Sequence, residues 1–545
     1  SEPPPLWGSN HWAVSGEHTD TGAPVLAYDP HLSLTVPPVW YEQHVTVTGG
    51  GGDEPVKEVR GATFPGIPFA IVGENRHGAW GFTNSGADVL DIYTYETDEE
   101  NERYMYDGDW RDFETETRTV EVADGEDREV EVKRTVHGVF IDREVAGETR
   151  HVGVRWTGMS GTRESEAVYE FGRTTDVDDY LEAVKKMDIP TQNALYVDDS
   201  GNVLYKLTGS IPIRRDEDGE VIRGDRVFDG SAGEAEWDGF EPFGESSWNE
   251  GFVPFEDKPG VLNPDYVGTA NQRIVDNPTY PIGYEYADGF RGERIYERLD
   301  ERVGSNEPVD DDFMKDLQTD SLDIRARILV PAVLEARELM PDSAETWLDA
   351  MEDWDYRMER DSEAAVAFHR FYDAFRRLTW EDDFEELNLG ESWWPRDRVL
   401  VSLPPDDEHF DGDRAGVMAD AMEEAIAEIE EERWEVYGDY NVTAIDHEFG
   451  EQVDALNYPR YPTDGTGSTV MNFHDGASAG ASWRQVSQMD DETESSSVIP
   501  GGQSASYFSD HYDDQLSMWA DGEYKEMSFE TPEEGDVIRF RGEDG

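Results

Sequence analysis

The hydrophobic and polar positions of the chain follow two different periods. Between residues 12 and 303, apolar residues alternate with polar ones over short runs such as 23–29, 68–74 and 201–209. This alternation, broken by Gly, Pro, Asn and Asp, is typical of strands in antiparallel sheets. We therefore expect this part of the chain to be built mainly of β-sheet.

A helical period replaces the alternation further along the chain. Apolar residues recur at three- and four-residue spacing in 311–339, 362–378 and 420–438, with acidic residues in the first turns. That spacing predicts amphipathic helices. Strand and turn character returns after Ala455. Because no repeat and no long linker divides the chain, we expect one large body with a helix-rich insertion at about 310–434.

The composition is strongly acidic but still allows a packed core. The 545 residues include 124 Asp and Glu against 45 Lys and Arg, a formal net charge of −79, yet 37% are hydrophobic and 12% aromatic. A disordered acidic chain would have few aromatics. The charge disfavours sequence-independent nucleic-acid binding and docking on anionic lipid. A folded, acidic, lysine-poor chain is typical of a protein from a halophile, because salt screens the repulsion between surface carboxylates.

The sequence excludes two classes of site and one class of segment. It contains no cysteine, so disulfides and thiolate metal sites are excluded. No apolar run approaches the roughly 20 residues that span a bilayer. The chain begins without methionine and contains no targeting segment, so we expect a processed or truncated product. We expect the protein to be secreted or located on the cell surface of a halophile.

Several short motifs, in a fixed order, carry the candidate chemistry. They are GSNHW (8–12), YDPHL (28–32), WGFTNSGADVLDIY (80–93), TANQRI (269–274), GFRGERI (289–295) and PGGQSASYFSDHYDDQLSMW (500–519). Together, from Gly8 to about Trp519, they resemble the large (β) subunit of the penicillin acylase family of N-terminal nucleophile hydrolases. The combination is specific, although no single motif is.

The resemblance implies a fold and a processing event. The fold would be α+β, the four-layer αββα sandwich of two antiparallel sheets, with residues 9–545 as the large subunit. The family is made as a precursor that cuts itself before the serine of a motif like GSNHW. The scissile bond would be Gly8–Ser9, residues 1–8 would be the remnant of a spacer, and a small (α) subunit from the same precursor would be the partner.

Ser9 would then be the nucleophile. A serine hydroxyl needs a base, and a free α-amino group, with a pKa of roughly 7.7–8.0, can serve as one near pH 8. Before cleavage the same nitrogen is an amide and cannot take a proton, so we expect the uncut chain to be inactive. On its own, a serine after glycine is more often a turn residue or a helix cap.

The resemblance also assigns the groups around the nucleophile. Asn84 would donate its backbone N–H to the oxyanion, and Asn271 would donate its side-chain amide. His31 would form a hydrogen bond near the nucleophile, and Arg294 would orient Asn271. Without this context, the two asparagines would be interpreted as turn residues and His31 as a structural histidine.

A structural calcium ion is implied as well. The family binds it through carboxylates matching Asp88 and Asp91, through backbone carbonyls matching Leu90 and Pro212, and through a ligand from the small subunit. Glu285 is the candidate for a further ligand. Two carboxylates at this spacing suit a hard cation, but in so acidic a chain a pair of acids is by default solvated surface.

The predicted function is hydrolysis of linear amide C–N bonds in N-acyl compounds. Candidate substrates are acylated β-lactams, N-acyl homoserine lactones, and acylated peptides or lipopeptides, and the sequence does not choose among them. One alternative is a non-catalytic binding protein that kept the fold. Another is a hydrolase with an internal Ser-His-Asp triad, for which GASAG around Ser478 is the one formal match.

Overall fold

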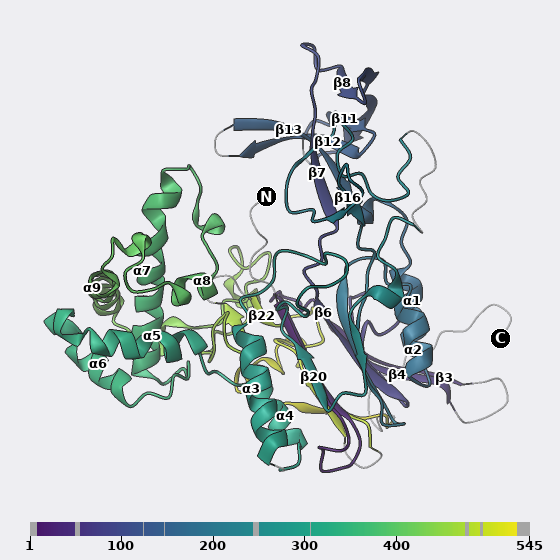
Figure 1. The fold of residues 1–545 in the computed structure, drawn as a ribbon. Helices are drawn as coiled ribbons and strands as arrows, with labels where there is room; N and C mark the ends of the chain where they lie inside the picture. Colours follow the sequence, from purple (N-terminus) through teal and green to yellow (C-terminus); the bar gives the residue numbers. More distant parts are fainter. Residues whose placement is uncertain are drawn as a thin grey trace.

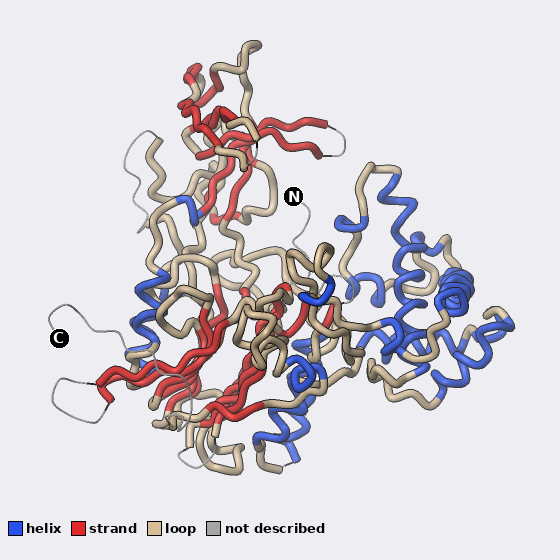
Figure 2. The backbone as a smooth tube through the Cα atoms, turned by 180° about the vertical axis from the view of Figure 1, so that it is seen from behind, coloured by secondary structure: helices blue, strands red, loops and turns tan. Residues whose placement is uncertain are grey.

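The structure is a computed structural model that describes residues 8–48, 55–123, 125–145, 148–242, 250–305, 307–474, 479–490 and 494–530. Two antiparallel sheets pack face to face at its centre, and helices cover the outer face of each (Figures 1 and 2). A smaller sheet and a cluster of helices extend from this sandwich on separate sides (Figure 1).

Within the described residues, the central sheets have eight and seven strands. The first consists of β20 (Tyr266–Thr269), β1 (Gly8–Val14), β2 (Val25–Ser33), β23 (Arg484–Gln488), β24 (Ser495–Val498) and β25 (Lys525–Met527), with β22 (Ala479–Ala481) and β21 (Phe473–His474) joined to β2. The second consists of β19 (Gly260–Leu262), β15 (Val203–Leu207), β14 (Gln192–Asp198), β6 (Gly78–Asn84), β5 (Val72–Asn75), β4 (Pro55–Thr63) and β3 (Tyr41–Thr48).

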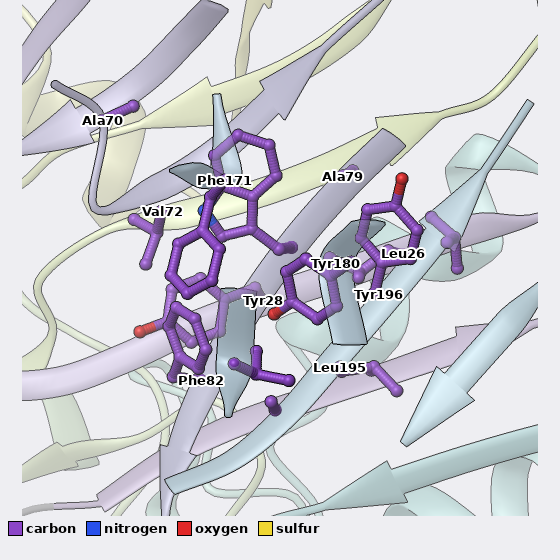
Figure 3. Packing of buried hydrophobic residues seen from close by; sticks show 14 of the residues in the cluster. Leu26, Tyr28, Ala70, Val72, Ala79, Phe82, Phe171, Tyr180, Leu195 and Tyr196 are labelled. Carbon is purple, nitrogen blue, oxygen red and sulfur yellow. The ribbon is translucent and has the colours of Figure 1, made fainter. Parts of the chain in front are cut away.

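The outer helices complete four layers. On the seven-stranded sheet lie α1 (Glu164–Phe171) and α2 (Val177–Val184), where Phe171 packs against Phe82 and Tyr180 stacks on Tyr196 (Figure 3). On the eight-stranded sheet lie α3 (Phe290–Ser305) and α4 (Asp311–Gln318). This is the αββα arrangement that the resemblance implied.

The third sheet forms the lobe at the top of Figure 1. Its strands are β10 (Glu114–Val120), β11 (Arg128–Thr135), β12 (Gly138–Val145), β13 (Glu148–Trp156), β7 (Leu90–Thr94) and β18 (Phe228–Asp229), and β18 pairs with β7 in parallel. Two short hairpins accompany it: β8 (Arg103–Tyr106) with β9 (Asp109–Asp112), and β16 (Arg214–Arg215) with β17 (Val221–Ile222).

The helical lobe has a hydrophobic core of its own, separate from that of the sandwich. It contains α5 (Ile324–Glu335), α6 (Glu345–Glu352), α7 (Glu363–Glu385), α8 (Asp397–Ser402), α9 (Arg414–Glu432) and α10 (Tyr437–Tyr440), while the short α11 (Leu516–Ala520) packs elsewhere. The segment 311–339 contains two α-helices, α4 and α5, and Asp323 caps the start of the second. α4 packs against the sandwich and not in this lobe. Within the described residues, no helix is long and apolar enough to cross a membrane.

β1 is the strand that positions the candidate nucleophile. All seven of its residues are buried, because β2 and β20 flank it, the second sheet covers one face and helices cover the other. Side chains of a strand alternate between the two faces. Ala13 packs in the core shared with the second sheet, whereas Trp12 and Val14 pack against α3 and α4. By this alternation, Ser9 lies on the face toward the second sheet and Asn10 on the opposite face.

Candidate active site

Ser9 lies in the wall of a cavity at the end of β1. The cavity has a volume of about 1650 Å³, and Gly8, His31, Asn84 and Asn271 line it together with Ser9. Ser9 is only 8% exposed, and its hydroxyl donates a hydrogen bond to the carbonyl oxygen of Gly8 at 2.6 Å. Four residues predicted from motifs far apart in the sequence therefore meet at one cavity.

Asn271 connects Ser9 with Asn84. Its Oδ1 accepts the backbone N–H of Ser9 at 2.7 Å, and its Nδ2 donates to the carbonyl oxygen of Asn84 at 2.9 Å. The backbone of Asn271 is left-handed, with φ of 65°, a conformation that asparagine adopts more readily than most residues. A side-chain amide nitrogen carries two hydrogens, so one N–H of Asn271 remains for an oxyanion.

The arginine that contacts Asn271 is Arg291, not Arg294. Arg291 lies in the first turn of α3, and its Nη2 donates to Asn271 Oδ1 at 3.1 Å. Its Nη1 donates to the carbonyl oxygen of Ser9 at 3.0 Å and to Asn10 Oδ1 at 2.6 Å. Arg294, three residues further along α3, pairs with buried Asp320. The orienting role predicted for Arg294 is therefore corrected to Arg291.

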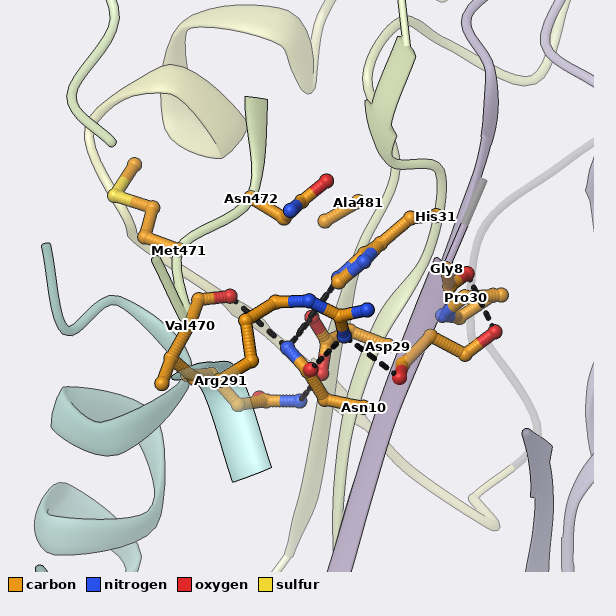
Figure 4. A network of polar contacts seen from close by, with 12 residues as sticks. Gly8, Asn10, Asp29, Pro30, His31, Arg291, Val470, Met471, Asn472 and Ala481 are labelled. Atoms are coloured by element: carbon orange, nitrogen blue, oxygen red, sulfur yellow. Dashed lines mark hydrogen bonds and ion pairs between the residues drawn. The ribbon is translucent and has the colours of Figure 1, made fainter. Parts of the chain in front are cut away.

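A buried polar network supports this group from the far face of β1 (Figure 4). Asn10 donates to Asp29 Oδ2 at 3.0 Å, and His31 Nε2 lies 2.7 Å from the same oxygen. Burial raises the pKa of the Asp29 carboxyl, although the charges of Arg484 and Arg291 act against it. Burial lowers the pKa of Arg291 to about 10, so its guanidinium stays protonated at neutral pH.

The cavity has two unlike walls. The wall formed by the sandwich is mainly apolar, whereas the wall contributed by the helical lobe carries charged residues. The apolar lining includes Leu32, Trp40, Phe64, Ile67, Phe69, Ile71, Phe82, Val168 and Met187. The charged lining includes Arg325, Asp373, Arg376, Arg396 and Asp397. An apolar group bound beside Ser9 would lie against the first wall.

The predicted calcium ligands do not fit a calcium ion in this arrangement. Calcium takes six to eight oxygen ligands at about 2.3–2.6 Å. The carboxylates of Asp88 and Asp91 and the carbonyl of Pro212 are instead within hydrogen-bond or ion-pair distance of one guanidinium, that of Arg214. The other two predicted ligands, Leu90 and Glu285, line the cavity.

Comparison with known proteins identifies the family of this chain. The family model for penicillin amidase matches residues 2–534. The chain belongs to this family.

Curated relatives carry two kinds of acylase name. The chain is 26% identical over 552 residues to penicillin acylase 2 proenzyme of Pseudomonas sp. strain SE83. The aligned region covers 94% of this chain and 66% of that protein. It is 23% identical over 303 residues to the acyl-homoserine lactone acylase QuiP of Pseudomonas fluorescens Pf0-1, covering 54% of this chain and 34% of that protein. The chain thus spans between about a third and two thirds of the relatives' lengths.

A solved structure has the same fold. Thermostable penicillin G acylase from Alcaligenes faecalis aligns with a TM-score of 0.68 and 19% sequence identity, covering 98% of this chain and 100% of that chain. The fold is therefore the N-terminal nucleophile hydrolase fold of the α+β class.

Sequence reasoning missed Arg291, Asp29, Asn10 and Arg214. Asn10, Asp29 and Arg291 all lie within motifs that carry the resemblance, and strand alternation alone places Asp29 on the same face as His31. No local signal points to Arg214, which is 123 residues from Asp91. Ser478, the candidate nucleophile of the alternative motif GASAG, and residues 1–7 of the spacer remnant lie outside the described residues.

Proposed function

We propose that this chain carries the nucleophile of an acylase that hydrolyses N-acyl amides through Ser9, after the Gly8–Ser9 bond has been cut. The observation that carries the proposal is the placement of Ser9 in the cavity wall with its backbone nitrogen 2.7 Å from Asn271 Oδ1. That nitrogen is the future α-amine. Membership of the family and the names of the relatives support the same chemistry.

Cleavage is the first step of the proposal. Ser9 Oγ attacks the carbonyl carbon of Gly8, the C–N bond breaks, and the hydroxyl proton goes to the departing nitrogen. Water then hydrolyses the resulting ester, which leaves a carboxylate on Gly8 and a free α-amine on Ser9. The contact of 2.6 Å between the hydroxyl and the Gly8 carbonyl oxygen supports this step.

Hydrolysis of substrate follows the same pattern. The α-amine takes the proton of the Ser9 hydroxyl while Oγ attacks the acyl carbon, and that proton passes to the leaving amine. Water then releases the acid from the acyl ester. The remaining N–H of Asn271 and the backbone N–H of Asn84 are the proposed donors to the oxyanion. Arg291 holds Asn271 and the carbonyl of Ser9 in place, so it is a positioning residue.

The apolar wall beside Ser9 points to an uncharged, apolar acyl group. Leu32, Phe69, Ile71 and Phe82 offer such a group no cation and no hydrogen-bond donor from their side chains. Burial of one methylene is worth about 0.8 kcal/mol, so we expect kcat/KM to rise about fourfold for each methylene that the wall covers. A dicarboxylic acyl group such as glutaryl would have to bury its charge and should be a poor substrate.

The function is tested on the full-length gene product. End-group sequencing of the purified protein should give Ser-Asn-His-Trp, and Asn271→Ala should lower kcat by about two to three powers of ten without loss of fold. Asn277→Ala is the matched control, because Asn277 has the same left-handed backbone but is exposed. A functional protein that retains Gly8, or an Asn271→Ala enzyme with normal turnover, would refute the proposal.

Substrate choice is tested with two series of N-acyl compounds. Hexanoyl, octanoyl and glutaryl nitroanilides compare acyl groups, and one acyl group carried on homoserine lactone and on a β-lactam nucleus compares the amines. We expect kcat/KM to be higher for the octanoyl compound than for the hexanoyl compound, and lowest for the glutaryl compound. Equal rates for glutaryl and octanoyl would exclude the apolar wall as the acyl site.

A further inference from the structure

Arg214 occupies the centre of the predicted calcium site. Its Nε donates to both oxygens of the Asp91 carboxylate, at 2.9 and 2.8 Å. Nη1 lies 3.2 Å from Asp88 Oδ2, Nη2 donates to the carbonyl oxygen of Asp88 at 3.2 Å, and Nη1 is 3.5 Å from the carbonyl oxygen of Pro212. Arg214 is 1% exposed, so solvent does not share these contacts.

We propose that the guanidinium of Arg214 is a built-in cation that replaces a metal ion here, so that the protein neither binds nor needs calcium at Asp88 and Asp91. A guanidinium has five N–H donors in a fixed planar fork and stays charged in proteins. It can therefore hold two carboxylates and two backbone carbonyls at once, as a divalent ion would. The inference does not depend on the proposed function.

The oxygens that a metal ion would need are occupied by protein donors. Besides Arg214, the backbone N–H groups of Leu90 and Gly224 act on the Asp88 carboxylate and favour its charged form, which lowers its pKa against the effect of burial. Trp237 Nε1 donates to Asp91 Oδ2 at 2.5 Å. A calcium ion would have to displace both sets of donors and leave the Arg214 guanidinium buried without its partners, which is strongly unfavourable.

Backbone packing fixes the guanidinium in this place. A Cβ added to Gly224 would lie 2.1 Å from Asp88 Oδ2 and 2.7 Å from Arg214 Cζ, so the backbone at 224 closes directly over the ion pair. The pair joins three segments distant in sequence, those of residues 88–91, 212–214 and 237. The first of them follows the cavity residue Asn84 by four positions. The Arg214 guanidinium would therefore hold the segment after Asn84 in place, and because it is covalently part of the chain, a chelator could not remove it.

The wild-type protein provides the first test. Metal content is measured by mass spectrometry, and Tm is measured in molar KCl, which screens the surface carboxylates, with excess EGTA and then with excess CaCl2. We expect far less than one calcium ion per chain and a Tm that is the same in both solutions, because a ligand that does not bind the folded state cannot stabilise it. One calcium ion per chain that is lost in Asp91→Asn, or a Tm lowered by EGTA, would overturn the proposal.

Variants of Arg214 provide the second test. Arg214→Lys keeps the charge but not the fork, and Arg214→Gln removes both, so Tm should fall in the order wild type, Lys, Gln. Arg215→Gln is the matched control, because Arg215 follows on the same strand and pairs with Asp238 near the surface; its Tm should match that of the wild type. A Tm for Arg214→Gln equal to that of Arg215→Gln would refute the role. If Arg214→Gln does not fold, the metal measurement still decides.

Discussion

Gly8→Ala separates self-cleavage from catalysis, because residue 8 lies on the removed side of the predicted scissile bond. A Cβ at this position would lie 2.5 Å from Arg291 Nη2 and 3.1 Å from Asn271 Oδ1. Ordinary van der Waals contact begins at about 3.4 Å, so the guanidinium would have to retreat by about 1 Å. Arg291 is held by Ser9, Asn10 and Asn271, so it cannot retreat without loss of hydrogen bonds.

The expected size of the effect follows from those bonds. A hydrogen bond to a charged group is worth about 1.5–3 kcal/mol. If one such bond is lost where it would stabilise the attack of Ser9 on Gly8, cleavage slows by about 10- to 100-fold, since about 1.4 kcal/mol corresponds to a factor of ten in rate. Under the proposed processing the mature chain begins at Ser9 and lacks residue 8, so its kcat and KM should equal those of the wild type.

The assay follows the conversion of precursor to mature chain over time by gel electrophoresis and intact mass, and then measures kcat on the matured fraction. Gly161→Ala is the control, because a Cβ at Gly161 meets no atom within 4 Å. Gly8→Ala cleaved at the rate of Gly161→Ala would show that Arg291 and Gly8 are not in contact during processing. A mature enzyme with altered kcat would show that the chain is cut elsewhere.

Three further predictions concern the site and the stability of the fold. Arg291→Lys should lower kcat, because an ammonium lacks the fork that holds Asn271, whereas Arg294→Lys should lower Tm at unchanged kcat; the reverse pattern would return the orienting role to Arg294. Burial lowers the pKa of His11 to about 3, so only the unfolded state takes up its proton between pH 6.5 and 3, and stability falls as pH falls. When the free energy of unfolding is measured with denaturant, its decrease from pH 7.5 to pH 5.5 should therefore be about 1 kcal/mol larger for the wild type than for His11→Gln. An equal decrease for the two proteins would contradict this prediction. Dialysis from molar salt into dilute buffer should lower Tm sharply and abolish hydrolysis, because the Debye length grows from about 3 Å at 1 M to about 30 Å at 0.01 M; a Tm that does not change with salt would refute the interpretation of the acidic composition.

The hydrophobic pattern predicted elements better than it predicted their ends. Strand character at 68–74 becomes β5, which begins only at Val72, because Phe69 and Ile71 lie at the cavity and not in the sheet. The four-layer architecture came from the resemblance, since alternation alone does not say which strands pair. The pairing of β1 with β20 joins residues more than 250 positions apart, and nothing in the local pattern encodes such a contact.

The candidate site shows the same limit for side chains. The family resemblance assigned Ser9, Asn84 and Asn271 to one site, because each of them lies in a different motif that matches the family. They could not separate Arg291 from Arg294, which differ by three positions on one helix and therefore by less than one turn. The choice depends on where α3 begins relative to β1, and that is set by tertiary packing. Arg291 falls in the first turn, beside Ser9, and Arg294 lies three residues further along the helix, beside Asp320.

Several arginines of this chain are buried, where dissolved salt does not reach them. Surface carboxylates are screened by concentrated salt, but a buried carboxylate is out of reach of mobile ions and needs a fixed partner. Arg214, Arg291, Arg294 and Arg325 are all buried, and Arg214, Arg294 and Arg325 each pair directly with a buried aspartate. Arginine suits these places better than lysine, because its fork binds several oxygens at once. The guanidinium groups of Arg214, Arg294 and Arg325 therefore neutralise buried carboxylates that solvent ions do not reach.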